Sequence, residues 1–264
     1  MPRRQDKPDF PYWLVLLGGI GLWLFYEVLA NDLYARVLDT LLRGIGTTLF
    51  VTAVAYFSAC LIGLGLAVAG LSRFILLRQV ARFYVEVVRG IPILVLLLYV
   101  AFVLAPALVL AVNWVGGHLG LQPWSTRDFP LIARAVIALT VAYSAFLAEV
   151  FRAGLLSVDP GQVEAAEALG LSPWQRFRHV VFPQAFRVIL PPLGNDFVAM
   201  VKDSSLVSVL GVADITQLGK VMAAGNFRYF ETYNVVALVY LTMTITLSLL
   251  LRRLEARMRA RTQR

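Results

Sequence analysis

Long apolar runs alternate with short polar and charged segments along the chain. Crossing the hydrocarbon core of a bilayer takes about 20 apolar residues in a helix, and six runs approach that length. The pattern therefore predicts an all-α polytopic membrane protein with about six transmembrane helices. The predicted spans are Tyr12 to Leu29, Gly46 to Leu71, Ile91 to Trp114, Leu131 to Val150, Val188 to Leu210 and Tyr233 to Leu251.

The first span supports two interpretations. The basic segment MPRRQDK, a short apolar run and the small residue Ala30 resemble a signal peptide. Glu27 and the bulky Tyr26 before that cleavage point favour a retained membrane anchor instead. Residues 30–43 then place apolar side chains at helical spacing between charges, which predicts an amphipathic helix at the membrane interface.

Small residues in the second span predict a close helix contact. Ala59 lies one helical turn before Gly63, and Gly65 follows. Small side chains let the backbones of neighbouring helices approach each other in a membrane. We interpret them as ordinary packing within this chain.

Composition and charge agree with a membrane location. The chain is 59% hydrophobic and 15% charged, with a mean hydropathy of +0.74. When the spans alternate in direction, most of the 24 Lys and Arg residues fall on one side. The excess of basic residues in cytoplasmic loops places both termini and the loop 152–187 in the cytoplasm. The net charge of +8 therefore requires no nucleic-acid partner. Cys60 is the single cysteine, and the two histidines are far apart, so we expect no disulfide within the chain and no metal site.

The loop at 159–183 carries two sets of helix-capping signals. Asp159 is a natural N-cap, Pro160 suits the first helical position, and Gly170 suits the end of the helix. Ser172 repeats the N-cap signal, and Pro183 is expected to stop the second helix. Two short helices joined by a tight glycine bend are therefore predicted. The apolar side chains of these helices need a surface to pack against. That surface could be the chain's own membrane domain or a soluble partner, and the spacing alone does not favour either one.

The fifth span is unusually polar. Pro191 and Pro192 are expected to break its hydrogen-bond ladder, and broken backbone at membrane depth is tolerated where it lines a water-filled cavity. An alternative is structural: Lys202 and Asp203 pair with other groups, and Asn195 binds carbonyls freed by the prolines. Glu149 in span four either faces the path or pairs with Arg152. The candidate residues of the substrate path are Glu149, Asn195, Lys202, Asp203, Ser204 and Ser205.

Two other functions could also explain the polar residues of the fifth span. Lys202 with Ser204 or Ser205 could form a Ser/Lys hydrolase site, but helical positions two apart point away from each other. An ion-coupled secondary transporter or channel is the stronger alternative, because a polar broken helix would serve ion-coupled flux equally well.

The charged loop also carries a specific motif. Glu164-Ala165-Ala166, Gly170 after three residues, and the sequence 180–183 ending in Pro183 resemble the EAA motif of bacterial ABC importer membrane subunits. Val180 and Phe182 replace the Ile and Leu of that pattern. Three further segments are similar to the polar amino-acid uptake subfamily: VVRGIPILVLL at 87–97, AYSAFLAEVFRAGL at 142–155 and PQAFRVILPPLGNDFVAMVKDSSLVSVLG at 183–211.

The resemblance implies a type I permease with a five-helix core, an extra N-terminal span and a cytoplasmic coupling helix. It divides the chain into an anchor and interfacial segment at 1–39, a transmembrane domain at 40–255 and a basic tail at 256–264. The residues expected to contact the ATPase subunit are Glu164, Ala165, Ala166, Leu169, Gly170 and Pro183. The R-G-x-P turn of the family corresponds to Arg89, Gly90 and Pro92, for which a structural role is expected.

The resemblance also implies partners in a bacterial inner membrane. They are two cytoplasmic ATPase subunits, a second identical or similar permease subunit, and an extracytoplasmic amino-acid-binding protein. The chain lacks a G-x-x-x-x-G-K-[ST] phosphate loop, so it is expected to be no enzyme and to bind no cofactor, with ATP and Mg²⁺ held by the partner ATPase.

Overall fold

The structure is a computed structural model that describes residues 12–262. The first basic segment, residues 1–11, lies outside the described residues, and so do residues 263–264. All regular elements of the described part are helical. The α-helices are α1 (Tyr12–Ala30), α2 (Asp32–Gly70), α3 (Ile75–Gly90), α4 (Ile93–Tyr99), α5 (Ala105–His118), α6 (Leu131–Leu156), α7 (Pro160–Ala168), α8 (Pro173–Arg176), α9 (Phe182–Asp203), α10 (Ile215–Asn226) and α11 (Tyr229–Thr262). Two π-helical turns, η1 (Val100–Leu104) and η3 (Phe177–Val181), and two 3₁₀ turns, η2 (Thr126–Asp128) and η4 (Ser204–Leu210), complete the described chain.

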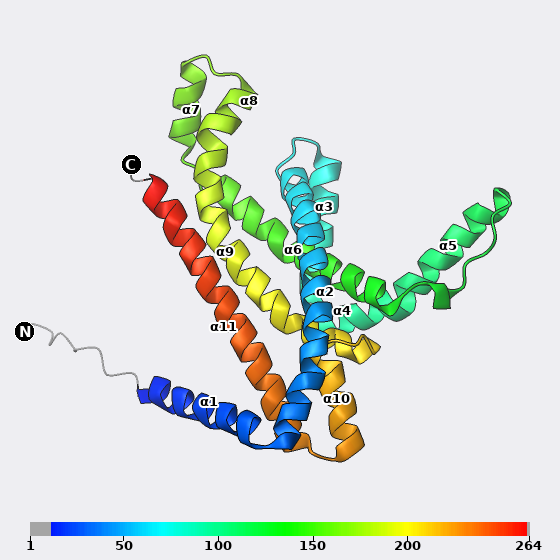
Figure 1. Ribbon diagram of the computed structural model, residues 1–264. Helices are drawn as coiled ribbons and strands as arrows, with labels where there is room; N and C mark the ends of the chain where they lie inside the picture. The colour runs from blue at the N-terminus through cyan, green and yellow to red at the C-terminus, as the bar shows by residue number, and fades with distance from the viewer. Residues whose placement is uncertain (1–11, 263–264) are drawn as a thin grey trace, which may run out of the picture.

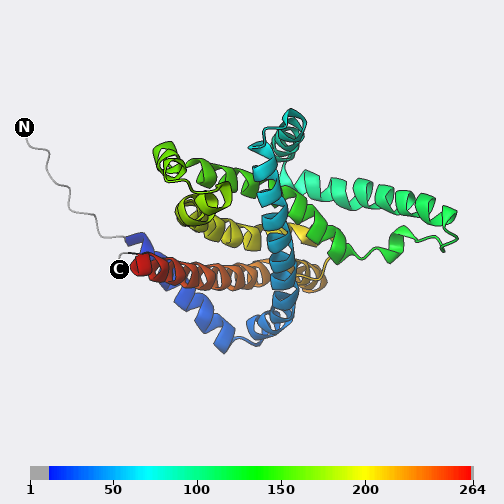
Figure 2. The same ribbon diagram turned by 90° about the horizontal axis from the view of Figure 1, so that it is seen from above.

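The long helices α2, α6, α9 and α11 form the body of the molecule (Figure 1). The α7–α8 hairpin and the C-terminal end of α11 lie at the same end of this body, whereas the turn between α10 and α11 lies at the opposite end. Helix α5 and the loop after it extend away from the body and from the hairpin in both views (Figure 2).

Four of the predicted spans correspond to helices that are long and apolar enough to cross a membrane. They are α2, the run from α4 to α5, α6 and α11. A fifth is a bent pair, in which α10 turns by 49° from the helix that ends at Leu210. For the first predicted span, the described residues provide a shorter apolar helix within α1, Gly18–Ala30.

One local prediction requires correction. Residues 30–43 do not form a separate interfacial helix, because α1 ends at Ala30 and α2 runs unbroken for 39 residues from Asp32. Gly44 does not end it, since this glycine lies against the backbone of Ile215, where a Cβ would come within 2.6 Å. Residues 75–90, which carry no predicted span, form the amphipathic helix α3, whose buried side chains Ala81, Val85 and Val88 face the body.

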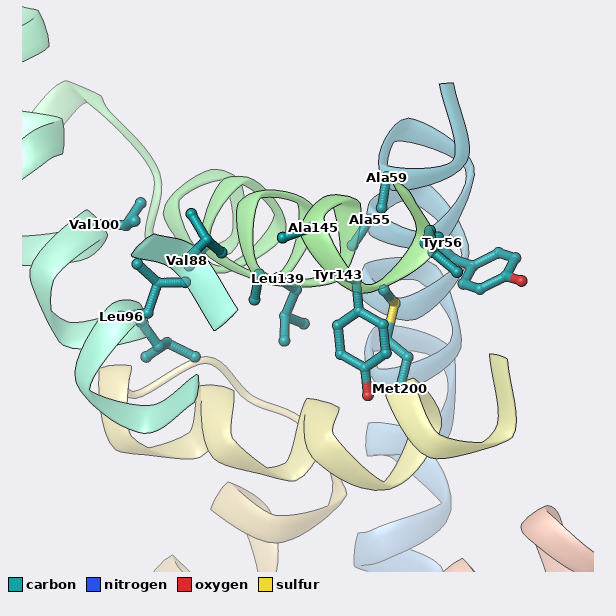
Figure 3. Close-up of a cluster of buried hydrophobic side chains, with 14 of the residues drawn as sticks. Ala55, Tyr56, Ala59, Val88, Leu96, Val100, Leu139, Tyr143, Ala145 and Met200 are labelled. Atoms are coloured by element: carbon teal, nitrogen blue, oxygen red, sulfur yellow. The ribbon is translucent and has the colours of Figure 1, made fainter. Parts of the chain in front are cut away.

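The centre of the fold is the packing of α2 against α6. Buried small residues recur every four positions along α2, at Ala55, Ala59, Gly63 and Ala67. They face a surface of α6 that is also rich in alanine, including Ala145 (Figure 3). This repeat brings the two backbones close together, as is usual for helices in membranes. The interpretation of Gly63 as a packing residue within this chain agrees with the structure, whereas Gly65 faces open space.

We predict that Gly63→Ala destabilises the protein. A Cβ at this position would lie 2.9 Å from the carbonyl oxygen of Ser144 and 3.0 Å from the amide nitrogen of Ala148. Both contacts are backbone atoms of α6, so the helices must separate, at a cost of about 1–3 kcal/mol. Thermal unfolding of the purified chain in detergent measures the loss. Gly65→Ala is the matched control, and an equal effect of the two variants would contradict the packing argument.

Candidate coupling hairpin and translocation path

The α7–α8 hairpin has the predicted caps. The Asp159 carboxylate accepts a hydrogen bond from the Gly161 N–H at 2.7 Å and begins α7. Gly170 has a φ of +77°, the left-handed conformation that glycine adopts without steric cost. Ser172 and Gln175 form a capping box in which the Gln175 side-chain oxygen accepts from the Ser172 N–H at 2.9 Å. The predicted caps and the glycine bend are therefore confirmed, and the first helix, α7, is short as predicted.

Side chains and backbone also hold the two helices of the hairpin against each other. The Gly170 N–H donates to the Glu167 carbonyl and the Leu171 N–H to the Ala166 carbonyl, which is the Schellman arrangement. Arg176 forms an ion pair with Glu167 at 2.5 Å across the bend. These bonds make the hairpin a single rigid unit rather than two loosely joined turns.

The hairpin leaves most of its apolar surface uncovered by the rest of the chain. Ala166 is buried, but Leu169 is 81% exposed and Trp174 is 65% exposed. Glu164, Ala165 and Gly170 are exposed as well. An open groove of about 470 Å³ lies along α7, and its lining includes Ala165, Ala166, Leu169, Leu171 and Val180. Packing under the chain's own membrane domain therefore accounts for little of this surface.

Pro183 does not end the second helix, contrary to the sequence prediction. Helix α8 continues through η3 into α9, where Pro183 occupies the first turn. In η3 the Phe182 N–H donates to the Phe177 carbonyl, five residues back. This wider turn accommodates the ring and the missing N–H of a proline. The hairpin and the fifth predicted span are thus joined by one continuous helical segment.

The fifth span is also unbroken at its double proline. Helix α9 runs through Pro191 and Pro192, so the prolines remove two bonds from the hydrogen-bond ladder, as predicted, without ending the helix. The Tyr56 hydroxyl of α2 donates to the Leu193 carbonyl at 2.7 Å and supports this part of the helix. The break comes later, at Gly211, whose φ is +84° and after which α10 begins in a new direction.

A buried tyrosine joins the polar end of α9 to α6. The Tyr143 hydroxyl donates to Asp203 Oδ2 at 2.7 Å, and Figure 3 shows its ring extending from α6 toward α9. Ser204 is buried and donates to the Val201 carbonyl at 2.8 Å, so its proton already has an acceptor. Asn195 and Lys202 are exposed. The structure therefore brings Asp203 and Tyr143 together, in an arrangement that gives no support to a Ser/Lys catalytic pair.

Glu149 forms an ion pair with Arg152, which is one of the two arrangements that the sequence allowed. Arg152 Nη2 lies 2.6 Å from Glu149 Oε2, and Nε donates to Oε1 at 3.1 Å. The pair lines a cavity of about 410 Å³ together with Arg82 and Glu86 of α3. Glu149 lies six residues beyond Tyr143, about 9 Å farther along α6, so it belongs to the hairpin end of the body rather than to the Asp203 cluster.

The R-G-x-P segment is a turn between helices. Helix α3 ends at Gly90, Ile91 is extended, and Pro92 is the N-cap residue of α4. The Arg89 guanidinium lies over the Phe146 ring, 5.8 Å from its centroid. These contacts fit the structural role expected for Arg89, Gly90 and Pro92.

Sequence reasoning missed the two tyrosines that support α9. Tyr143 is 60 residues from Asp203, and Tyr56 is 137 residues from Leu193. Both tyrosines lie in apolar runs, where a hydroxyl signals only that a polar partner is required. No local spacing identifies that partner.

Apolar spanning helices, a polar bent span and an exposed rigid hairpin define the class: a polytopic membrane transport protein. Residues 59–261 match the family described as binding-protein-dependent transport system inner membrane component, so the chain belongs to that family. It is the permease subunit of an ABC importer rather than an ion-coupled transporter or a hydrolase.

Named relatives cover most of the chain. The glutamine transport system permease protein GlnP of Escherichia coli is 38% identical over 222 residues, which are 83% of this chain and 93% of that protein. The probable amino-acid permease protein YxeN of Bacillus subtilis is 37% identical over 211 residues, or 80% and 88% of the two chains. A solved amino acid ABC transporter with histidines is 36% identical with a TM-score of 0.70, over 84% of this chain and 96% of that one.

We predict that Tyr143→Phe reduces transport while leaving the fold intact. The variant keeps the buried ring but removes the donor to Asp203. A hydrogen bond to a charged group contributes about 1.5–3 kcal/mol, so uptake should fall roughly tenfold or more if the carboxylate must be held in place. Uptake into proteoliposomes and the thermal midpoint measure the two effects.

The matched control is Tyr84→Phe, which removes a hydroxyl that contacts Ser144 and Val141 away from α9. Equal uptake by wild type and Tyr143→Phe would refute a transport role for the Tyr143–Asp203 bond. A similar loss in both variants would assign the effect to helix packing.

Proposed function

We propose that the chain is the permease subunit of an importer that moves a polar amino acid across a bacterial inner membrane, driven by ATP hydrolysed on separate cytoplasmic subunits. The observation that carries the proposal is the uncovered hairpin continuous with the polar span α9. The substrate class is supported by the relatives, one of which is named for glutamine and another for amino acids.

The proposed orientation places the hairpin in the cytoplasm. Basic residues gather in α3 and in the segment from the end of α6 to α9, where Arg82 and Arg152 share one cavity. Such an excess of basic residues marks the cytoplasmic side. The C-terminal end of α11 lies at the same end of the body as the hairpin (Figure 1), which supports a cytoplasmic C-terminus. A cytoplasmic N-terminus is proposed from the sequence alone.

The hairpin is the proposed contact with the ATPase. Its exposed side chains and backbone would enter a groove of that subunit, with ATP and Mg²⁺ bound there and not by this chain. Alanine side chains keep α7 thin along the open groove. The Arg176–Glu167 ion pair would hold the two helices of the hairpin together when the ATPase moves it. The proposed contact residues are the exposed Glu164, Ala165, Leu169 and Gly170, whereas the buried Ala166 packs inside the hairpin end of the chain and Pro183 is part of the connection to α9.

The polar end of α9 is the proposed wall of the substrate path. A second permease subunit would face the exposed Asn195 and Lys202, since polar side chains at membrane depth require a water-filled or protein-lined space. Asp203, held by Tyr143, is suited to the amine of a zwitterion. Ser204 and Ser205 begin η4 beside it, and the Glu149–Arg152 pair would lie nearer the cytoplasmic exit. An extracytoplasmic binding protein would deliver the substrate at the opposite side.

We predict that Gly170→Asp uncouples ATP hydrolysis from transport. A left-handed backbone costs aspartate less than most residues, so the main change is a carboxylate and its negative charge on the exposed contact surface at the bend. The subunit should still insert and assemble, because nothing lies within 4 Å of a Cβ at this position. Uptake and ATP hydrolysis are measured on the complex of permease, ATPase and binding protein in proteoliposomes.

Gly170→Asn is the control for charge, because asparagine has the shape of aspartate and tolerates the left-handed conformation as well, but carries no charge. It should retain more coupling than a β-branched replacement such as Gly170→Val. Wild-type uptake that needs no ATP, or that stops when ion gradients are collapsed, would refute the ABC import mechanism. Fully coupled uptake by Gly170→Asp would refute only the role of the bend.

A further inference from the structure

Arg134 is a buried cation near the start of α6 whose partners are backbone carbonyls. It is 7% exposed. Its Nε donates to the Phe129 carbonyl at 3.1 Å, Nη1 donates to the Ala101 carbonyl at 3.2 Å, and Nη2 donates to the Thr126 carbonyl. The guanidinium also lies 5.7 Å from the centroid of the Phe129 ring. A buried arginine in a membrane protein is expensive and marks a functional role more often than a packing role.

The Ala101 carbonyl needs this donor because the helix cannot supply one. Its usual partner four residues on, the Ala105 N–H, donates instead to the Val100 carbonyl in the π turn η1. The next residue is Pro106, which has no N–H. Ala101 is completely buried, so its carbonyl would otherwise be left unpaired. Arg134 thus closes a gap that the π turn and the proline create together.

The same side chain holds the loop that follows α5. Asn113 of α5 pairs with the backbone of Trp124 in both directions, each bond being 2.7 Å long. Ser125 and Asp128 form a capping box around η2. Arg134 then binds two carbonyls of this segment. The loop therefore has a defined conformation. Asn113 binds it to α5, and Arg134 binds it to α6 and η1.

Arg134 lies where the loop after α5 meets the helical core that leads to α9. Helix α4 packs against α6 and against η4, the segment that begins at Ser204 beside Asp203. Beyond η1, α5 leaves the body and leads to the loop (Figures 1 and 2). Arg134 contacts η1 at the point where these two parts meet. It fixes the loop relative to α4, and α4 packs against η4, which follows the polar end of α9.

We propose that Arg134 is a positioning residue that transmits the docking of the extracytoplasmic binding protein from the loop 119–130 through η1 and α4 to η4. The proposal rests on the proposed import function, with the loop on the outer side. The bond to the proline-freed Ala101 carbonyl is its essential part. Without that bond the loop is joined to the helical run from α4 to α5 only through Asn113 and the far end of α5, so a partner seated on the loop has less effect on α4 and on the path.

The test uses the complex of permease, ATPase and binding protein in proteoliposomes. Arg134→Met removes all donors from a side chain of similar length. ATP hydrolysis stimulated by the binding protein should fall about tenfold, because the loop loses a charge-assisted hydrogen bond to η1. Hydrolysis without the binding protein should stay within about twofold of wild type, because the hairpin contacts are distant. Arg127→Gln, a change to an exposed arginine of the same loop, is the matched control and should leave both rates unchanged.

A second variant tests the role of the carbonyl itself. Pro106→Ala restores a backbone N–H that can reach the Ala101 carbonyl in the π register, but it makes no link to the loop. The double variant Arg134→Met/Pro106→Ala should therefore keep the reduced stimulated rate of Arg134→Met, and recovery of that rate would show that Arg134 only pairs the carbonyl. If Arg134→Met does not assemble, Arg134→Lys serves in its place, with a reduced stimulated rate and an unchanged basal rate expected.

Three outcomes would overturn the proposal. They are full stimulation in Arg134→Met or its Lys substitute, an equal fall of basal and stimulated rates together with a lower thermal midpoint, and recovery of stimulation in the double variant Arg134→Met/Pro106→Ala. Failure of the import function itself is distinguishable, because wild type would then show no uptake that depends on ATP and on the binding protein.

Discussion

A bilayer offers no hydrogen bonds to an exposed backbone, so each peptide group at membrane depth needs a partner within the protein. This constraint determines how the chain uses its prolines. Before Pro106, a π turn shifts the backbone bonds by one residue, and a similar turn precedes Pro183 outside the membrane. Where a carbonyl within the membrane still lacks a hydrogen-bond donor, a side chain from another helix supplies one, as Arg134 does for Ala101. The helices therefore remain continuous at residues that would break them in isolation.

Close helix packing supplies the rigidity that this arrangement requires. Lipid tails are as apolar as leucine side chains, so helices in a membrane are held by contact between small surfaces rather than by exclusion of water. The repeat of small residues along α2, with Gly63 against the backbone at Ser144, fixes α6 in depth and rotation. Only with α6 so fixed does the Tyr143 hydroxyl meet Asp203.

Features encoded by neighbouring residues were predictable from the sequence, whereas those that depend on distant residues were not. Apolar run length located the spans, and the caps at Asp159 and Ser172 defined the hairpin. The effect of Pro183 was mispredicted because it depends on a π turn that has no simple local signature. Helix α9 continues past Pro191, and Asp203 is held in place, with the help of side chains from other helices. A single sequence does not show which distant side chains come close.

The continuity of α8, η3 and α9 has a mechanical consequence. If the prolines had broken this segment, a displacement of the hairpin would be absorbed there and would not reach Asp203. In the observed arrangement the helix passes both proline sites intact and is supported by Tyr56 on its way. The first break in the backbone comes at Gly211, where α10 turns by 49°. Movement of the hairpin should therefore carry the whole polar end of α9 with it, and the strain should appear beyond the path, at Gly211.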